Sequence, residues 1–127
     1  METIIITNNE KVNIDYSDRY KVEFYPEKSQ LEILLAARDY VHLGGKLLMH
    51  PMMGRIKPHE TPYKSVILET GSSQVSMESL LMIEDSIQTT RKFMEDTAYI
   101  KYYDEILSDL QFIDKTLLDS GVEELER

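Results

Sequence analysis

The fold is decided by residues 29–51, whose sequence SQLEILLAARDYVHLGGKLLMHP contains a complete helix followed at once by a strand. Ser29 and Glu32 have the spacing of a capping box, in which each side chain bonds a free backbone N–H at the start of a helix. Gly44 begins a glycine pair, and glycine supplies the left-handed conformation that ends many helices. The pattern therefore predicts a helix that starts at Ser29, stops at the glycines and leads into a short apolar strand over residues 46–50.

Two further strands are predicted before this helix. Residues 3–7 are a β-branched run, TIIIT, which indicates a strand buried on both faces. Residues 20–25 alternate apolar and polar side chains, which predicts a second strand. Residues 10–19 are compatible with either a weak helical turn or an irregular crossing. Because strand, helix and strand follow one another here, we expect a right-handed parallel crossover.

After the crossover the pattern changes from loop to strand to helix. Residues 51–62 carry three of the four prolines and no periodicity, which indicates a long loop, and residues 63–70 alternate like a strand. Two apolar stripes at helical spacing run over about 76–118, with a weak break at 97–98. We therefore expect two helices packed as a hairpin, and a frayed end over residues 119–127.

These elements predict an α/β fold. We expect one compact domain over residues 1–127, with an about four-stranded, mainly parallel sheet flanked by helices and a C-terminal helical hairpin. The length supports this interpretation, because a chain of 127 residues buries roughly two thirds of its surface in a single core.

Composition excludes several classes of function. The chain has no cysteine, which rules out disulfides, thiolate metal sites and thiol catalysis. Its net charge of −9, with no basic stripe, argues against nucleic acid as a partner. We expect neither a signal peptide nor a transmembrane helix, no membrane association and a cytoplasmic location, because the apolar runs are short.

The charge is unevenly distributed. Residues 95–127 hold ten acidic side chains against three basic ones, whereas residues 42–68 hold Lys46, Arg55, Lys57 and Lys64 against a single acid, Glu60. A local excess of positive charge favours a small-anion site or a docking patch.

The predicted topology places this basic segment at a possible binding edge. If the crossover is parallel, the carboxyl ends of the first and third strands share an edge of the sheet with the N-terminus of the helix that starts at Ser29, which is where open α/β sheets bind ligands. We predict ligand or partner contacts from the following residues: Asn8, Asn9, His50, Arg55, Lys57, Thr61, Tyr63, Lys64 and Ser65.

These residues suggest distinct roles. Arg55, Lys57 and Lys64 would contact an anion. Asn8, Asn9 and Thr61 would supply neutral hydrogen bonds, and His50 would be a donor that switches near neutral pH.

An enzyme is the alternative. His50 and Glu60 could act as an acid–base pair on a carboxylate or phosphate substrate. We expect no metal, because the spacing of His50 and His59 matches no ligand pattern, and no cofactor, because a glycine-rich phosphate loop is missing.

Two segments resemble the GrdX family: residues 50–65, HPMMGRIKPHETPYKS, and residues 4–9, IIITNN. The resemblance extends over most of the chain and is most specific at Lys57-Pro58 and at residues 60–65. Met52 and Met53 depart from the expected pair, close to Leu-Ser, after His50-Pro51.

The family resemblance implies a setting rather than a reaction. GrdX proteins are small proteins encoded beside glycine, sarcosine and betaine reductase components in anaerobic amino-acid-fermenting bacteria. The resemblance implies an accessory or binding protein whose loop, residues 50–65, contacts a small anion or a glycine reductase component. A third hypothesis makes the C-terminal helices a homodimer interface.

Overall fold

The helix at the centre of the prediction forms as the capping residues indicate. It is α2 (Gln30–His42), and at its start Ser29 Oγ accepts a hydrogen bond from Glu32 N while Glu32 Oε1 accepts one from Ser29 N, both at 3.2 Å. After the helix, Gly44 has a φ of 103°, and a Cβ there would lie 2.1 Å from the carbonyl oxygen of Ser72. The start of this helix is therefore determined locally, as predicted, whereas the glycine at its end is required both by its own φ and by the close approach of Ser72.

The computed structural model describes residues 1–54, 57–95 and 104–127. The elements before α2 are β1 (Glu2–Thr7), α1 (Glu10–Tyr16) and β2 (Lys21–Phe24). Those after it are β3 (Lys46–Leu47), a 3-10 turn η1 (Pro58–Glu60), β4 (Ser65–Thr70), α3 (Met77–Glu95) and α4 (Asp104–Leu125). Between the first two strands, where the sequence left two alternatives, the chain is helical, and Asn9 Oδ1 caps α1 by accepting from Lys11 N at 3.0 Å.

The sheet is mixed, so the prediction of a mainly parallel sheet is wrong. The strand order is β2-β1-β4-β3, in which only the β1–β2 pair is parallel and β4 runs antiparallel to both of its neighbours. The strands joined by α2 do run in the same direction, but they lie at opposite edges of the sheet. The reason for the error is that β4 inserts between β1 and β3, and a strand buried on both faces has the same composition in either orientation.

Three strands are shorter than predicted, and β2, expected over residues 20–25, covers Lys21–Phe24. The strand expected over residues 46–50 is limited to Lys46–Leu47, followed by one more ladder bond from Leu48 N to Ile67 O at 3.0 Å. The strand expected from residue 63 begins at Ser65. β3 therefore ends, and β4 begins, at the loop that contains the candidate site.

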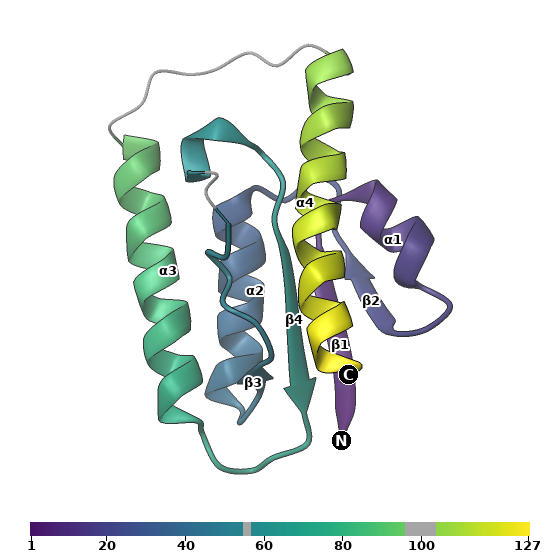
Figure 1. Cartoon of the computed structure of the whole chain (residues 1–127). Coiled ribbons are helices and arrows are strands. Elements are labelled where there is room, and N and C mark those ends of the chain that lie inside the picture. The colour runs from purple at the N-terminus through teal and green to yellow at the C-terminus, as the bar shows by residue number, and fades with distance from the viewer. Residues whose placement is uncertain (55–56, 96–103) are drawn as a thin grey trace.

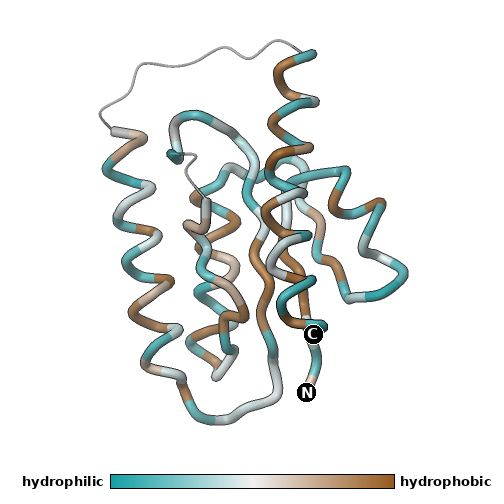
Figure 2. Tube along the Cα trace, in the orientation of Figure 1, coloured by the Kyte–Doolittle hydropathy of each residue, from teal (hydrophilic) through white to brown (hydrophobic). Residues whose placement is uncertain are grey.

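The molecule has three layers (Figure 1). On one face of the sheet, Ile4, Ile6, Val66 and Leu68 pack against α2 and α3. On the other face, Ile5 and Ile67 pack with side chains of α1 and α4, and hydrophobic segments line both interfaces in Figure 2.

The last two helices do not form a hairpin. Helix α3 packs on α2, whereas α4 packs on α1 and β4 across the sheet, so the two helices cover opposite faces. The break predicted at Thr97–Ala98 lies outside the described residues. The predicted fraying of residues 119–127 is also wrong, because α4 continues to Leu125 and buries Leu118 and Val122. Across the described ranges, no helix combines the length and the apolarity that crossing a membrane requires.

Candidate functional site

A group of polar side chains lies between the sheet edge and α4, and we call it the inner polar cluster: Thr7, Asn9, Lys64, Ser65 and Asp114. Thr7 and Ser65 are register partners on β1 and β4, and their hydroxyl oxygens are 2.7 Å apart. Ser65 Oγ donates to Asp114 Oδ2 at 2.7 Å, and Asn9 Nδ2 donates to the same oxygen at 3.0 Å. Three segments of the chain, residues 7–9, residues 64–65 and α4, therefore meet around this carboxylate.

The two charged members of this cluster influence each other electrostatically. Burial raises the pKa of Asp114, while the hydrogen bonds from Asn9 and Ser65 and the charge of Lys64 oppose that shift. Burial lowers the pKa of Lys64, and the carboxylate of Asp114 opposes it. Lys64 Nζ also donates to the carbonyl oxygen of Pro51 at 2.7 Å. The ammonium group therefore holds the start of its own loop.

Asn8 connects three parts of the backbone near this cluster. Its Nδ2 donates to Lys28 O at 2.8 Å and to Pro62 O at 2.9 Å, and its Oδ1 accepts from Lys64 N at 2.9 Å. Asn8 is 6% exposed. The amide predicted to bind a ligand is thus engaged in holding the loop against the end of β1.

Gln30, the first residue of α2, fixes the loop from the opposite side. Its Nε2 donates to Pro58 O at 3.2 Å and also to Thr61 O. Its Oε1 is buried and has no hydrogen-bond partner within the described structure. This residue faces a cavity that is also lined by Thr61, Lys64 and Asp114.

The remaining predicted residues lie along the loop. Thr61 Oγ1 accepts from Tyr63 N at 3.2 Å. Burial raises the pKa of Tyr63, and a hydrogen bond with the Gln111 side chain opposes the shift. Both residues are partly buried. They shape the inner wall of the loop rather than its outer surface.

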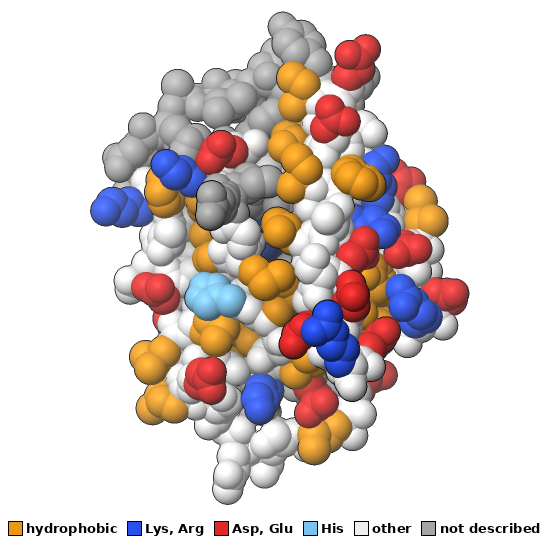
Figure 3. Space-filling view, viewed as in Figure 1, with side chains coloured by type: hydrophobic (Ala, Val, Ile, Leu, Met, Phe, Trp, Pro, Cys, Tyr) orange, Lys and Arg blue, Asp and Glu red, His pale blue; other side chains and the backbone are white. Residues whose placement is uncertain are grey.

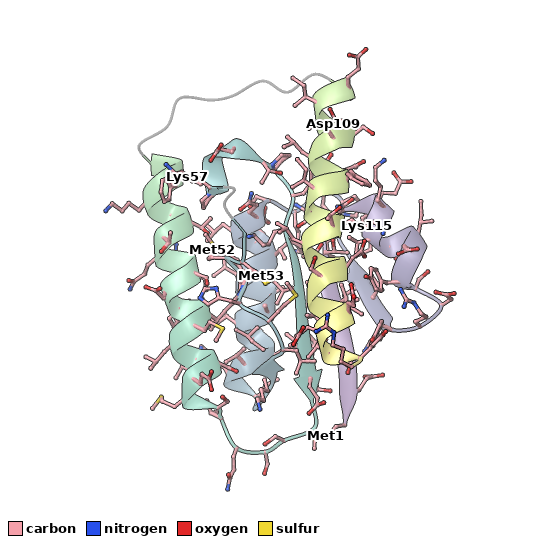
Figure 4. All side chains as sticks on the ribbon, viewed as in Figure 1. Met1, Met52, Met53, Lys57, Asp109 and Lys115 are labelled. Atoms are coloured by element: carbon pink, nitrogen blue, oxygen red, sulfur yellow. The ribbon has the colours of Figure 1, made fainter. Side chains whose placement is uncertain are left out.

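His50, Lys57 and Glu60 are exposed. His50 Nδ1 accepts from Met52 N at 3.0 Å, and Glu60 Oε1 accepts from Lys57 N at 3.0 Å. Neither bond joins His50 to Glu60. Lys57 lies near the end of α3 in Figure 4.

The structure therefore divides the predicted site residues into two sets. Asn8, Asn9, Lys64 and Ser65 come together at the inner polar cluster, with Thr61 and Tyr63 beside it. Lys57 is on the surface, and Arg55 lies outside the described residues. His50 is exposed, but it also lines the small cavity beside Lys64, Ser65 and Asp114.

Sequence reasoning missed Asp114 and Gln30. The sequence pattern did not single out Asp114, because the C-terminal third has many acidic residues and such residues typically form a solvated face. A signal was present, because Asp114 follows Leu110 by four residues and precedes Leu118 by four, which places it on the buried side of α4. Gln30 is a polar first-turn residue with no distinctive pattern.

The empty spaces near the loop differ greatly in size. Two small, partly open cavities beside Lys64 and Asp114 measure about 20 Å³ each, which is the space of about one water molecule. A groove of about 340 Å³ lies outside them, between the loop and the end of α4. We call it the Met49 groove, and its lining includes Leu48, Met49, His50, Met53, Glu124 and Leu125.

The Met49 groove is an apolar surface feature. Figure 3 shows hydrophobic side chains gathered on this face of the molecule, along α4. Met53 lies beside α4 in Figure 4. Gly121 faces the groove from α4, and a Cβ on it would lie 2.4 Å from Met49 Sδ, so the glycine allows the loop to approach the helix closely.

Metal binding has no support from side-chain placement. In the parts of the chain that the structure describes, no three histidine or acidic side chains are grouped so that they could hold a metal ion.

A comparison with protein family models finds a match over almost the whole chain. The family model described as GrdX-like protein matches residues 4–123. No curated protein and no solved structure matches the chain.

Proposed function

Because the chain belongs to the GrdX-like protein family, we propose that it is an accessory protein of glycine reductase-type amino-acid fermentation that binds a protein component of the reductase. The binding surface is the loop of residues 50–65 together with the adjoining Met49 groove. The observation that carries this proposal is the size of the groove, about 340 Å³, beside small cavities that hold only about one water each.

The charges of the loop support a protein partner over a small anion. Lys64, one of the three cations expected to contact an anion, donates to Pro51 O and faces Asp114. Lys57 is on the surface. The two described cations thus have different surroundings, which supports a protein partner over a small anion held by both.

The contacts of the loop also favour binding over catalysis. The acid–base hypothesis requires His50 and Glu60 to act on one substrate, but the hydrogen bond of each side chain is to the backbone of its own loop. Asn8, Gln30 and Lys64 attach the described parts of the loop to the rest of the fold, and pre-organisation of this kind lowers the entropy lost on association.

The test is to measure binding of the separately purified protein components of a glycine reductase to the immobilised chain. We expect one component to bind, and Met53→Ser to weaken that binding by about tenfold, since apolar contacts at the centre of an interface dominate affinity. Lys57→Ala should weaken it less, and Lys21→Ala, at an exposed lysine of β2 on the sheet edge opposite β3, is the matched control that should leave it unchanged. Binding of no component would overturn the proposal, and so would a thermal shift with inorganic phosphate that Lys57→Ala abolishes.

A further inference from the structure

The Met49 groove is large enough for a bulky side chain together with part of the segment that carries it. Its volume of about 340 Å³ is at the lower end of the range for small-molecule pockets. Met49, Met53 and Leu125 line it, and methionine is flexible and makes favourable sulfur contacts with aromatic rings. An aromatic or large aliphatic anchor is therefore the occupant that this lining fits.

The edge of the groove is acidic. Glu124 lines the groove, and its side chain is 73% exposed. Arg127 Nη1 lies 3.3 Å from Glu124 Oε2. Exposed pairs of this kind contribute little to stability, so a cation on a partner could replace Arg127. Residues 119–127, at the end of α4 that lines the groove, have four acids and one base, a net charge of −3, which attracts positive charge to this end of the helix.

The same charge disfavours a second copy of the chain as the occupant. A symmetric dimer through this groove would bring two acidic α4 helices together, and like charges at an interface oppose association. The groove and its rim therefore select a partner of opposite charge.

We infer that the Met49 groove binds an aromatic side chain flanked by lysine or arginine on the partner protein. This inference rests on the proposed function, and it specifies the chemistry of the partner segment. The aromatic ring lies between Met49, Met53 and Leu125, and a neighbouring cation pairs with Glu124.

A short synthetic peptide with one tryptophan between lysine and arginine residues tests this inference directly. The chain contains no tryptophan, so the emission of the peptide reports its own environment. We expect a blue shift of that emission on binding to the wild-type protein. Leu125→Ser and Met53→Ser should weaken binding by about tenfold, because they remove apolar contacts to the ring.

Two charge variants are expected to change peptide binding in opposite directions. Glu124→Gln should weaken peptide binding by about threefold, and Arg127→Ala, which removes the competing cation, should strengthen it by a similar factor. Binding should also weaken as salt is added. Leu81→Ser, at an exposed leucine on α3, is the matched control and should have no effect.

Three results would overturn the inference: no blue shift, equal binding by a peptide with glutamates in place of the bases, or equal binding by all the groove variants. Concentration-dependent dimerisation of the wild-type chain that Leu125→Ser abolishes would assign the groove to a second copy instead. If a reductase component binds but Leu125→Ser and Glu124→Gln leave its affinity unchanged, the inference fails while the proposed function stands. If the peptide binds as expected and no component does, the proposed function fails alone.

Discussion

Asp114 lies on the buried side of α4, where its carboxylate accepts hydrogen bonds from Asn9 and Ser65. A carboxylate in that position loses hydration, which explains why the pKa is raised even though two donors and the Lys64 ammonium stabilise the charged form. In the inner polar cluster, hydrogen bonds and the charge of Lys64 therefore partly offset the cost of desolvating the Asp114 carboxylate. The cluster joins α4 to the edge of the sheet.

This balance predicts a pH dependence for Asp114→Asn. Because the folded pKa of Asp114 is above its unfolded value, the folded state binds the proton more tightly, and the stabilisation from this group is present at low pH and decreases as pH rises through the folded pKa. The free energy of unfolding of the wild type minus that of Asp114→Asn should therefore decrease from about pH 4 towards neutrality. Urea unfolding of both proteins across this range measures it. A difference that increases with pH would show that the carboxylate is net stabilised when charged.

Asn8→Ala tests the attachment of the loop. The substitution leaves Lys28 O, Pro62 O and Lys64 N without their side-chain partner. We expect the free energy of unfolding to fall by about 2–3 kcal/mol, because buried polar groups that lose a partner retain the cost of desolvation. Urea unfolding checks this, with Asn13→Ala on α1 as a control expected to change stability by about 0.5 kcal/mol or less. Equal effects of the two substitutions would mean that Asn8 does not hold the loop.

At the scale of elements, the last two turns of α4 are a structural part of the second core. Leu118 is 1% exposed against β1 and β4, whereas Leu125 is 43% exposed at the groove. Leu118→Ala should lower the free energy of unfolding by about 3 kcal/mol through lost burial and a cavity, and Leu125→Ala by well under that amount. Thermal or urea unfolding of the two variants distinguishes them. A small effect of Leu118→Ala would restore the prediction that this end of the helix frays.

The elements themselves could be predicted from local signals, but their pairing could not. Ser29, Glu32 and Gly44 act within a few residues of where they stand, so they determine the ends of α2. The orientation of β4 depends on how the long loop returns the chain to the sheet, and the residues of the strand itself do not indicate that orientation.

The candidate site divides for the same reason. Asn8 and Asn9 follow the first strand, which predicts a place at the sheet edge, and Lys64 and Ser65 belong to the basic segment expected there; that they bind a ligand stays a prediction. Their central partner, Asp114, was not predicted, since it approaches from the opposite end of the sequence. Only the packing of α4 on the face of Ile5 and Ile67 brings the carboxylate to that edge, and helix packing of this kind is a property of the tertiary structure.

At the scale of the whole molecule, one sheet supplies both hydrophobic cores. Ile4 and Ile6 of β1 face the α2–α3 layer while Ile5, between them, faces the α1–α4 layer. β4 alternates in the same way through Val66, Ile67 and Leu68. Because β1 and β4 contribute side chains to both cores, loss of either strand disrupts both layers. The two layers should therefore unfold together.

Ile87→Ala tests this coupling, because Ile87 is 1% exposed and belongs to the α2–α3 layer alone. The substitution should lower global stability by about 2–4 kcal/mol. Native-state hydrogen exchange should then show the same loss of protection for the slowest amides of β1 and β4 and for those near Leu118 on α4, across the sheet from the substitution. Leu118→Ala is the matched variant on the other face and should reduce protection around Ile87 in turn. Loss of protection confined to α2 and α3 in the first variant, and to α1 and α4 in the second, would show that the layers unfold independently and that the shared strands do not couple them.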